Sequence, residues 1–444
     1  MLTLISVLLL LISGQLVLNL FQPNAGKVKP VTANAQPTST PKSKSTATLT
    51  PAPTQDVDAA SSTFSPINIP DDPRLSPLQL PAGYFLIYEQ TTNLYLVSSA
   101  SKSSQIIPTQ GYIYNEAVPP ILTPSGQLLY SGNGIWLTNP FGGIPTQIAD
   151  LPPGQVITSM ALSNDGKMIA WSTEPVEGTG NIDIHAGPLA APSIVLEQPA
   201  LNCPCFRIFS FMNGVGPQAD NTLLLTDDRG SHEAVQYGLW SLDLTQTPAT
   251  AQPILDENPQ QGPLAMTPPG NGLLYSSNEG AVPLPTDSSI PADVAALSYA
   301  NDLNLATVSG SSLALGPSQV ILAEQHNLSN SAQYHWVTTP IFSPDGHTLA
   351  YVEFSSDSQD PYDRHSALYT VQVSGSGTRL NASKPRLIAT STELLIELGP
   401  WLNKHIITFY ADSSLYAMDL QTNAITTLVQ PGTYARIVAV IGSQ

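Results

Sequence analysis

Charged residues are scarce in this chain, and basic residues are the scarcest of them. Lys and Arg together number 15 among 444 residues, against 33 Asp and Glu, which gives a formal net charge of −18. A nucleic-acid-binding protein needs a basic face to neutralise phosphates. The composition therefore predicts no nucleic-acid partner. An acidic balance suits cationic partners or divalent ions, although its commonest effect is solubility.

Several catalytic motifs are also missing from the sequence. It contains no Gly-x-Ser-x-Gly nucleophile elbow, no phosphate-binding loop and no dinucleotide-binding glycine fingerprint. Its histidines are scattered, with no His-Glu-x-x-His and no His-x-His pair, so their default interpretation is surface or strand histidines. What the chain has instead is 41 Pro and 30 Gly, a turn-rich composition that favours β-structure over long amphipathic helices.

A short repeated motif organises the rest of the sequence. It is clearest in residues 340–354 (PIFSPDGHTLAYVEF), where two apolar runs flank a Ser-Pro-Asp-Gly turn. Pro344 presets the backbone for a turn, and Gly346 can adopt the positive φ that closes it. Leu349 and Tyr351 then begin a strand of near-alternating apolar residues. Variants of the motif start at Ile121, Met160 and Ala265, and a degenerate one starts at Leu398.

A second motif follows each turn at a fairly constant distance. It consists of an aliphatic residue, an aromatic residue and an aliphatic stretch, as in Leu94-Tyr95-Leu96. A weaker apolar run comes next, so each unit supplies four short strands with a period of roughly 40–50 residues, which is typical of a β-propeller blade. A single four-stranded sheet cannot cover both of its faces, whereas blades packed around an axis cover each other. A β-sandwich, the alternative fold, would not repeat a turn motif in register.

The combination of SPDG with LAY or IAW resembles the WD40-like repeats of TolB-type β-propellers, and the resemblance covers most of residues 83–444. It implies an all-β propeller fold and says little about activity. It also implies a choice among three roles: periplasmic partner binding, a sensor module on a membrane kinase, or a gating domain of a serine peptidase. The missing nucleophile elbow, and the lack of sequence for a hydrolase domain after the last repeat, argue against the peptidase role.

The repeats predict seven four-stranded blades. Blade one has three strands within residues 84–107, and the chain ends in an apolar run at residues 435–442. We expect this last strand to become the innermost strand of blade one, which closes the ring. Blades two to seven are expected at about 119–148, 156–196, 206–255, 263–323, 337–390 and 394–429. Blade five fits worst, because residues 276–311 form a long insertion that reads as a short helix or an extra hairpin, and counts of six or eight blades stay open.

Two segments precede the propeller, which is expected over residues 83–444. Residues 1–21 are apolar and uncharged, which predicts a transmembrane helix as an anchor or an uncleaved signal segment. Residues 22–82 are rich in Thr, Ser, Pro and Ala and lack the apolar content to fold, which predicts a disordered linker.

The orientation of this anchor is ambiguous in the sequence. Lys27 and Lys29 follow the apolar run and no basic residue precedes it, so the positive-inside rule would place the propeller in the cytoplasm. We favour an extracytoplasmic propeller on a stalk at the cell membrane, because long domains translocate with little regard for such charges. A start codon further upstream is a third alternative.

The order of strands within a blade predicts two unlike faces. The Ser-Pro-Asp-Gly turns join first and second strands and share one face, which we call the turn face. The long connections join second and third strands, or successive blades, and share the opposite face, which we call the loop face. Because binding residues commonly lie on loops held by a rigid scaffold, we expect the binding surface on the loop face of blades three to six. The candidate residues are Asp227, Asp228, Arg229, His232, Trp336, Asp360, Tyr362, Asp363, Arg364 and His365.

Three features of this surface carry specific hypotheses. The acidic groups around Asp227 and Asp363 have the oxygen density of a weak Ca²⁺ site, but their spacing does not match an EF-hand, and a solvated acidic hairpin is the simpler interpretation. No other cofactor is predicted. Cys203 and Cys205, the only two cysteines, allow a disulfide outside the cytoplasm, two ordinary thiols or, least favoured, a soft-metal site. Trp336 is expected just before a strand and is the candidate exposed aromatic anchor.

These observations favour a membrane-tethered, extracytoplasmic propeller that binds a protein, peptide or glycan without catalysis. Two alternatives remain. One is a propeller enzyme of the lyase or glycosidase type, which needs paired carboxylates that converge in the channel. The other is the sensor half of a membrane signalling protein.

Overall fold

A computed structural model shows the chain as an all-β propeller. It describes residues 67–69, 75–80, 83–200, 204–212, 221–227, 237–255, 265–268, 270, 272–281, 299–309, 314–322, 334–356, 365–376, 379–391, 396–411 and 413–442.

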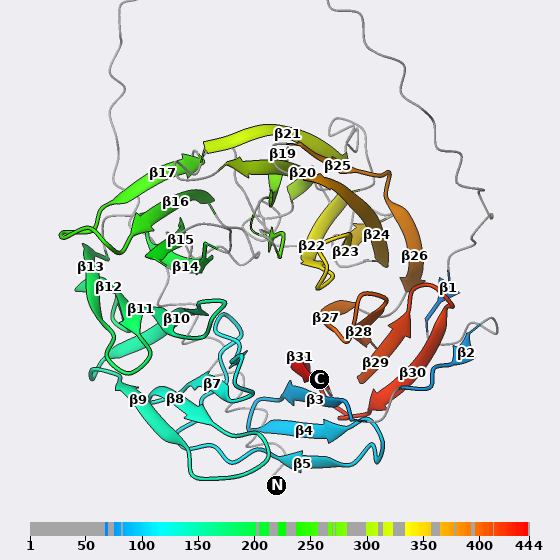
Figure 1. Cartoon of the computed structure of the whole chain (residues 1–444), viewed down its shortest axis with the longest axis horizontal. Helices are drawn as coiled ribbons and strands as arrows, with labels where there is room; N and C mark the ends of the chain where they lie inside the picture. Colours follow the sequence, from blue (N-terminus) through cyan, green and yellow to red (C-terminus); the bar gives the residue numbers. More distant parts are fainter. Residues whose placement is uncertain are drawn as a thin grey trace, which may run out of the picture. The chain divides into compact units, whose positions relative to one another are not determined.

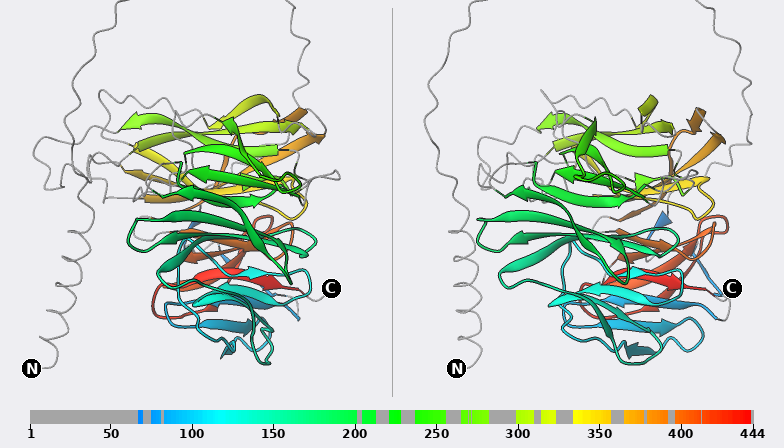
Figure 2. Two further views of the ribbon diagram at one scale, coloured as in Figure 1. Left: turned by 90° about the vertical axis from the view of Figure 1, so that its left-hand side faces the viewer. Right: turned by 60° about the vertical axis from the view of Figure 1, so that its left-hand side comes forward.

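Seven sheets stand around a central axis, one for each expected blade (Figure 1). Side views show that the strands run between the two faces of the ring (Figure 2). Within each blade the strands are antiparallel neighbours, in order from the innermost to the outermost strand. Blade one consists of β31 (Arg436–Ile441), β3 (Phe85–Glu89), β4 (Leu94–Ser98) and β5 (Ser104–Ile106). Blade two consists of β6 (Ile121–Leu122), β7 (Leu128–Ser131), β8 (Gly134–Thr138) and β9 (Thr146–Asp150). Blade three consists of β10 (Gln155–Leu162), β11 (Met168–Pro175), β12 (Asn181–Pro188) and β13 (Ser193–Pro199).

The other four blades follow the same plan. Blade four consists of β14 (Phe206–Phe211), β15 (Thr222–Asp227), β16 (Tyr237–Asp243) and β17 (Ala251–Leu255). Blade five consists of β18 (Ala265–Met266), β19 (Gly272–Ala281), β20 (Tyr299–Ser309) and β21 (Ala314–Leu322). Blade six consists of β22 (Tyr334–Phe342), β23 (Thr348–Ser356), β24 (His365–Ser376) and β26 (Arg386–Ser391). Blade seven consists of β27 (Glu397–Trp401), β28 (Ile406–Ala411), β29 (Ser414–Asp419) and β30 (Ala424–Val429).

The tight turns of the turn face follow from the chemistry of their first and third residues. In blade six the Ser343 hydroxyl donates to the Asp345 carboxylate at 2.6 Å and accepts the backbone N–H of Thr348 at 2.9 Å. Gly346 has a φ of 71°, a region that glycine adopts without strain. The turn that begins at Ser163 in blade three repeats this pattern of hydrogen bonds. The motif therefore satisfies its own polar groups and needs no help from other blades.

The hydrophobic core lies between neighbouring blades. Among the described residues, seven clusters of buried apolar side chains each join one blade to the next around the ring. The second strand of a blade is covered on both faces, and β15 is buried along its whole length. Leu223 and Leu225 pack toward blade three, whereas Leu224 packs toward blade five. This double burial explains why the second strands carry apolar residues at consecutive positions, as in Leu223 to Leu225, and not only at the near-alternating positions expected from the sequence.

The predicted closure of the ring is confirmed. β31 pairs antiparallel with β3, from Phe85 opposite Ile441 to Glu89 opposite Arg436. The last strand of the chain is therefore the innermost strand of the first blade, and the count of seven blades replaces the alternatives of six or eight.

The segment that precedes blade one contributes two further strands that the sequence analysis did not anticipate. β1 (Ile67–Asn68) pairs parallel with β26, and β2 (Ser76–Pro77) pairs parallel with β30, so each adds to the outer edge of a blade. Ile69 is 2% exposed and packs between blades six and seven. Leu78 and Leu80 pack between blades seven and one. Both strands lie within residues 22–82, which the composition alone predicts as a linker.

The predicted anchor at residues 1–21 lies outside the described residues and stays a prediction. In the part of the chain that the structure describes, no helix is long and apolar enough to cross a membrane.

Two regions differ from what the sequence predicts. The described ends of the insertion in blade five lengthen β19 and β20 as strands, and residues 282–298 lie outside the described residues. In blade six, β25 (Arg379–Ala382) pairs with the end of β24 and forms a hairpin on the turn face, which the sequence predicts to be plain. The repeat motif does not reveal this extension, because it lies beyond the aromatic signature of the third strand.

Deletion of residues 434–444 should open the ring. The deletion removes β31 and with it the buried side chains of Ile437 and Ala439. Because burial of one aliphatic side chain contributes about 1.5–3 kcal/mol, and because β3 would gain a free edge, we expect the melting temperature to fall by at least about 10 °C. Calorimetry measures this change, with deletion of residues 443–444 as the control. Equal melting temperatures for both truncations would contradict the closure.

Candidate functional site at the loop face

Carboxylates gather where the second strands of four blades reach the loop face. They are Glu89 in β3, Glu174 in β11, Asp227 in β15 and Glu353 in β23. Three of them are buried, with exposed fractions of 1% for Glu89, 0% for Asp227 and 5% for Glu353. A buried carboxylate is costly unless hydrogen bonds or an opposite charge compensate it. The partners of these groups therefore define the chemistry of this face.

Glu89 is held by the closing strand of the ring. Arg436, the first residue of β31, forms an ion pair with Glu89 and donates from Nε to Oε1. The Tyr112 hydroxyl donates to the other oxygen, Oε2, at 2.8 Å. The same guanidinium donates to the backbone carbonyls of Asn115 and Glu116, in the connection from blade one to blade two. One cation thus joins the closing strand, the second strand of blade one and the next connection through charge-assisted hydrogen bonds.

Burial dominates the electrostatics of this ion pair. It raises the pKa of Glu89 above its usual value, while the Arg436 charge and the Tyr112 hydrogen bond lower it. Burial and the neighbouring Glu89 carboxylate also raise the pKa of Tyr112, which keeps this hydroxyl a donor. The Tyr114 ring lies beside the guanidinium, with 6.0 Å between the ring centroid and Arg436 Cζ.

A second carboxylate lies on the blade-seven side of Arg436. Glu397 begins β27, and its Oε2 accepts a hydrogen bond of 2.6 Å from the Tyr434 hydroxyl. The Tyr434 ring packs edge-on against Tyr410, with 5.2 Å between the ring centroids. Burial raises the pKa of Glu397, and the Tyr434 hydrogen bond and the Arg436 charge oppose this rise. Two partly or fully buried carboxylates therefore share the field of one arginine at the junction of blades seven and one.

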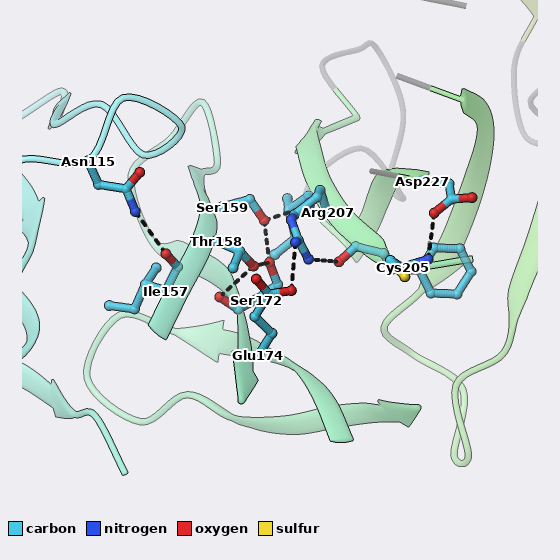
Figure 3. Close-up of polar contacts among 11 residues, drawn as sticks. Asn115, Ile157, Thr158, Ser159, Ser172, Glu174, Cys205, Arg207 and Asp227 are labelled. Atoms are coloured by element: carbon cyan, nitrogen blue, oxygen red, sulfur yellow. Dashed lines mark hydrogen bonds and ion pairs between the residues drawn. The ribbon is translucent and has the colours of Figure 1, made fainter. Parts of the chain in front are cut away.

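Blades three and four are joined by a separate polar cluster (Figure 3). Arg207 in β14 donates from Nη2 to Glu174 Oε2 at 2.7 Å, so the ion pair crosses the interface between the two blades. The Ser159 hydroxyl accepts the backbone N–H of Ile208 at 2.7 Å, which is a second bond across the same interface. Ser172 forms a hydrogen bond of 2.5 Å with Ser159. These contacts fix the first strand of blade four against blade three.

Asp227 is the one predicted acidic residue of the 227–233 hairpin that the structure describes. Its Oδ1 accepts the backbone N–H of Cys205 at 2.6 Å, and the residue is fully buried (Figure 3). The expected solvated hairpin is therefore wrong for this residue, because the carboxylate serves the connection into blade four. Cys205 is disulfide-bonded, and Cys203, the other cysteine of the chain, lies outside the described residues.

Two more candidate residues lie in strands rather than in loops. Trp336 is inside β22, opposite Phe354 of β23, and not before the strand as expected. His365 is the first residue of β24, opposite Ser355. Both stand at the strand ends that meet the loop face. The remaining candidates lie outside the described residues: Asp228, Arg229, His232, Asp360, Tyr362, Asp363 and Arg364.

Metal binding at this face stays a hypothesis. In the described ranges, no three His, Cys, Asp or Glu side chains come together as a metal site would require. The Ca²⁺ hypothesis concerned residues of which only Asp227 and His365 are described, so it is not tested.

The polar cluster around Arg436 was not predicted from the sequence. The sequence holds a signal for it, which is a glutamate just after an aromatic residue at the end of a second strand. Glu89 directly follows Tyr88, and Glu353 stands two residues after Tyr351. Arg436 is also conspicuous as a lone cation at the start of the closing strand in a chain that has only 15 Lys and Arg.

Comparison with known proteins gives similarity of fold. No protein-family model and no curated protein matches the sequence. A solved protein from Lactobacillus plantarum is 12% identical, with a TM-score of 0.49 over 82% of this chain and 100% of that one. A putative TolB from Agrobacterium tumefaciens is 13% identical, with a TM-score of 0.37 over 82% and 100% of the two chains. An oligogalacturonate lyase in complex with manganese is 12% identical, with a TM-score of 0.43 over 79% and 85%. The propeller fold that the sequence predicts is confirmed by the seven sheets of the structure itself, and these distant similarities say nothing of activity.

Replacement of Glu397 by Gln should change how stability depends on pH. Burial holds the folded-state pKa of Glu397 above its ordinary value of 4.5, so the wild type loses stability as the pH rises through that pKa. Gln has no charge to bury and keeps an acceptor for Tyr434. We therefore expect the free energy of unfolding of E397Q, minus that of the wild type, to increase between about pH 4 and about pH 7.

Urea unfolding over this pH range measures the difference. The matched control is Glu177→Gln, at an exposed position after β11, for which we expect little change with pH. A difference for E397Q that is flat or falls with pH would show that burial does not govern this carboxylate.

Proposed function

We propose that the protein is a non-enzymatic binding propeller, tethered to a membrane outside the cytoplasm, that takes a protein, peptide or glycan on its loop face. The observation that carries this proposal is the difference between the faces. Apart from the hairpin of β24 and β25, the described part of the turn face is built of short turns that satisfy their own polar groups, as at Ser343 and Asp345. At the loop face, ion pairs hold the strand ends together, Arg436 with Glu89 and Arg207 with Glu174, and the connections between strands stand on this rigid frame. Connections held in this way suit recognition.

The hydrogen bonds of the carboxylates Glu89 and Glu397 support a binding role over a catalytic one. A general acid or base must reach the proton that it transfers. In Glu89 one oxygen is held by Arg436 and the other by Tyr112, and the residue is 1% exposed. In Glu397 the Oε2 atom is held by Tyr434. These bonds give both carboxylates a structural task and favour the binding scaffold over the lyase or glycosidase alternative.

The proposed location rests on the sequence before the propeller and on one covalent bond. Residues 1–21 are long and apolar enough for an anchor, and the Thr/Ser/Pro-rich residues that follow suit a stalk. The disulfide at Cys205 is a bond that persists in oxidising compartments. Both features agree with a propeller outside the cytoplasm.

Protease added to intact cells should release the propeller. Because the stalk lacks the apolar residues that protect a folded chain, we expect cleavage within residues 22–66 and a soluble fragment that ends at the natural C-terminus. Mass spectrometry of the released fragment locates the cut. Full protection in intact cells, with cleavage only after lysis, would support the cytoplasmic orientation instead.

Truncation of loop-face residues should weaken partner capture while the fold stays intact. Arg364→Ala and Trp336→Ala remove residue types that dominate binding hot spots, and each should cost on the order of 1–2 kcal/mol of affinity. The matched control is Asp345→Ala, which removes a turn hydrogen bond on the opposite face. Quantitative capture from cell-envelope extracts compares the three variants with the wild type. Equal capture by all variants, or a loss confined to D345A, would place the binding surface elsewhere.

A further inference from the structure

The outer wall of the propeller contains a groove between blades three and four. It has a volume of about 440 Å³. One side is formed by the end of β13, around Leu196, and the other by Thr250 and Ala251 at the start of β17. Its floor contains Phe206 and Trp240, whose rings pack edge to face with 5.3 Å between centroids. The groove is thus an apolar slot beside the outermost strand of blade three.

The same kind of place is filled by the chain itself at two other interfaces. β1 pairs with the outermost strand of blade six, and Ile69 enters the core between blades six and seven. β2 pairs with the outermost strand of blade seven, and Leu78 and Leu80 enter the interface between blades seven and one. In the sequence these segments form a repeated hexapeptide, SPINIP at residues 65–70 and SPLQLP at residues 76–81. The outer wall of the propeller therefore already binds two segments with the pattern aliphatic–polar–aliphatic.

Comparison of the outermost strands singles out β13. β26 and β30 are covered by β1 and β2, and β5 has only three residues. β17 and β21 contain Pro253 and Pro317 in their interior, and these residues lack the N–H that an added strand needs, whereas Pro199 of β13 is the last residue of its strand. β9 has five residues and is mainly polar. β13 has seven residues and an aliphatic run that starts at Ile194, which is 48% exposed. Among the described residues no strand covers its outer edge, and such an edge favours addition of a strand.

The charges beside β13 indicate which polar residue a strand added at this edge would carry. Asp183 on β12 lies directly opposite Glu197 on β13, and like charges in this position repel. The Asp183 Oδ1 atom is buried without a hydrogen-bond partner. Burial, and then the Glu197 charge, raise the pKa of Asp183. The adjacent pair, Ile184 and Leu196, faces blade four. Because neighbouring side chains on a strand point to opposite sides, the two carboxylate side chains point away from blade four, although Glu197 also borders the end of the groove.

We propose that the edge of β13 binds an extended segment of a partner polypeptide with the pattern aliphatic–basic–aliphatic, added parallel to β13 as β1 and β2 add to their blades. The two aliphatic side chains enter the groove over Phe206 and Trp240. The basic side chain between them points the other way and neutralises Glu197 and Asp183. None of the candidate residues of the loop face lines this groove, so the proposal does not depend on the function proposed above.

The experiment uses the full-length protein and a labelled peptide probe. The probe carries residues 75–82 with Gln79→Lys, and fluorescence anisotropy measures its affinity. We expect saturable binding below roughly 1 mM, the weak end of specific association. Thr250→Trp fills the mouth of the groove from an exposed position and should weaken the probe at least about tenfold. The control Thr146→Trp, at an exposed position on the outer edge of blade two, should leave the affinity unchanged.

A charge exchange separates specific binding from a general loss of fold. Glu197→Lys removes the repulsion with Asp183, so the variant should fold at least as well as the wild type. It should bind the Gln79→Lys probe more weakly and a Gln79→Glu probe more tightly than the wild type does. No saturable binding, equal affinity of T250W and T146W, or indifference to the charge exchange would each overturn the proposal. Concentration-dependent dimerisation that T250W abolishes would overturn it in favour of residues 65–81 of a second copy.

Discussion

Each blade of this protein has a second strand that carries apolar side chains on both faces, and such a strand is stable only between two neighbours. In β15 all six residues are buried, with Leu223 against blade three and Leu224 against blade five. A sheet of this kind has no solvent side, so a blade at the end of an open row would expose a full apolar face. Closure of the ring removes both ends at once, and the seven buried clusters follow from it.

Closure also determines the electrostatics of the loop face. Glu89, at the end of β3 beside the closing strand β31, is 1% exposed. The strand that closes the ring also supplies the cation that Glu89 needs, because Arg436 is the first residue of β31. Removal of one partner from a buried ion pair costs about 3–5 kcal/mol, because the other charge stays in place without compensation. Packing and charge therefore both depend on the same strand.

The fold was predictable from the sequence because its signals are local. The turn at Ser343 holds itself together with hydrogen bonds inside residues 343–348, so it looks the same wherever it occurs. The candidate site was much less predictable. Glu89 and Arg436 are 347 positions apart in the chain, and no local sequence pattern around either residue predicts the other as its partner. Asp227 resembles a solvated loop acid in sequence, yet its partner is a backbone N–H from another segment. Trp336 stands in a strand because β22 is longer than the repeat suggests.

Composition hides the role of the segment before blade one for a similar reason, because its partners lie in distant blades. Short Pro-rich stretches cannot form a core of their own, so their composition predicts a linker. They can still order when a blade supplies the hydrogen bonds and a cleft for one or two side chains. β2 does this beside blade seven, and Leu78 and Leu80 pack into the interface between blades seven and one. Blade one is completed beside that interface by β31, which pairs with β3. The segment thus adds apolar contacts beside the closing blade. A pulling force on the chain before Ile67 would act first on β1 at blade six, and only then on β2 and the interface between blades seven and one.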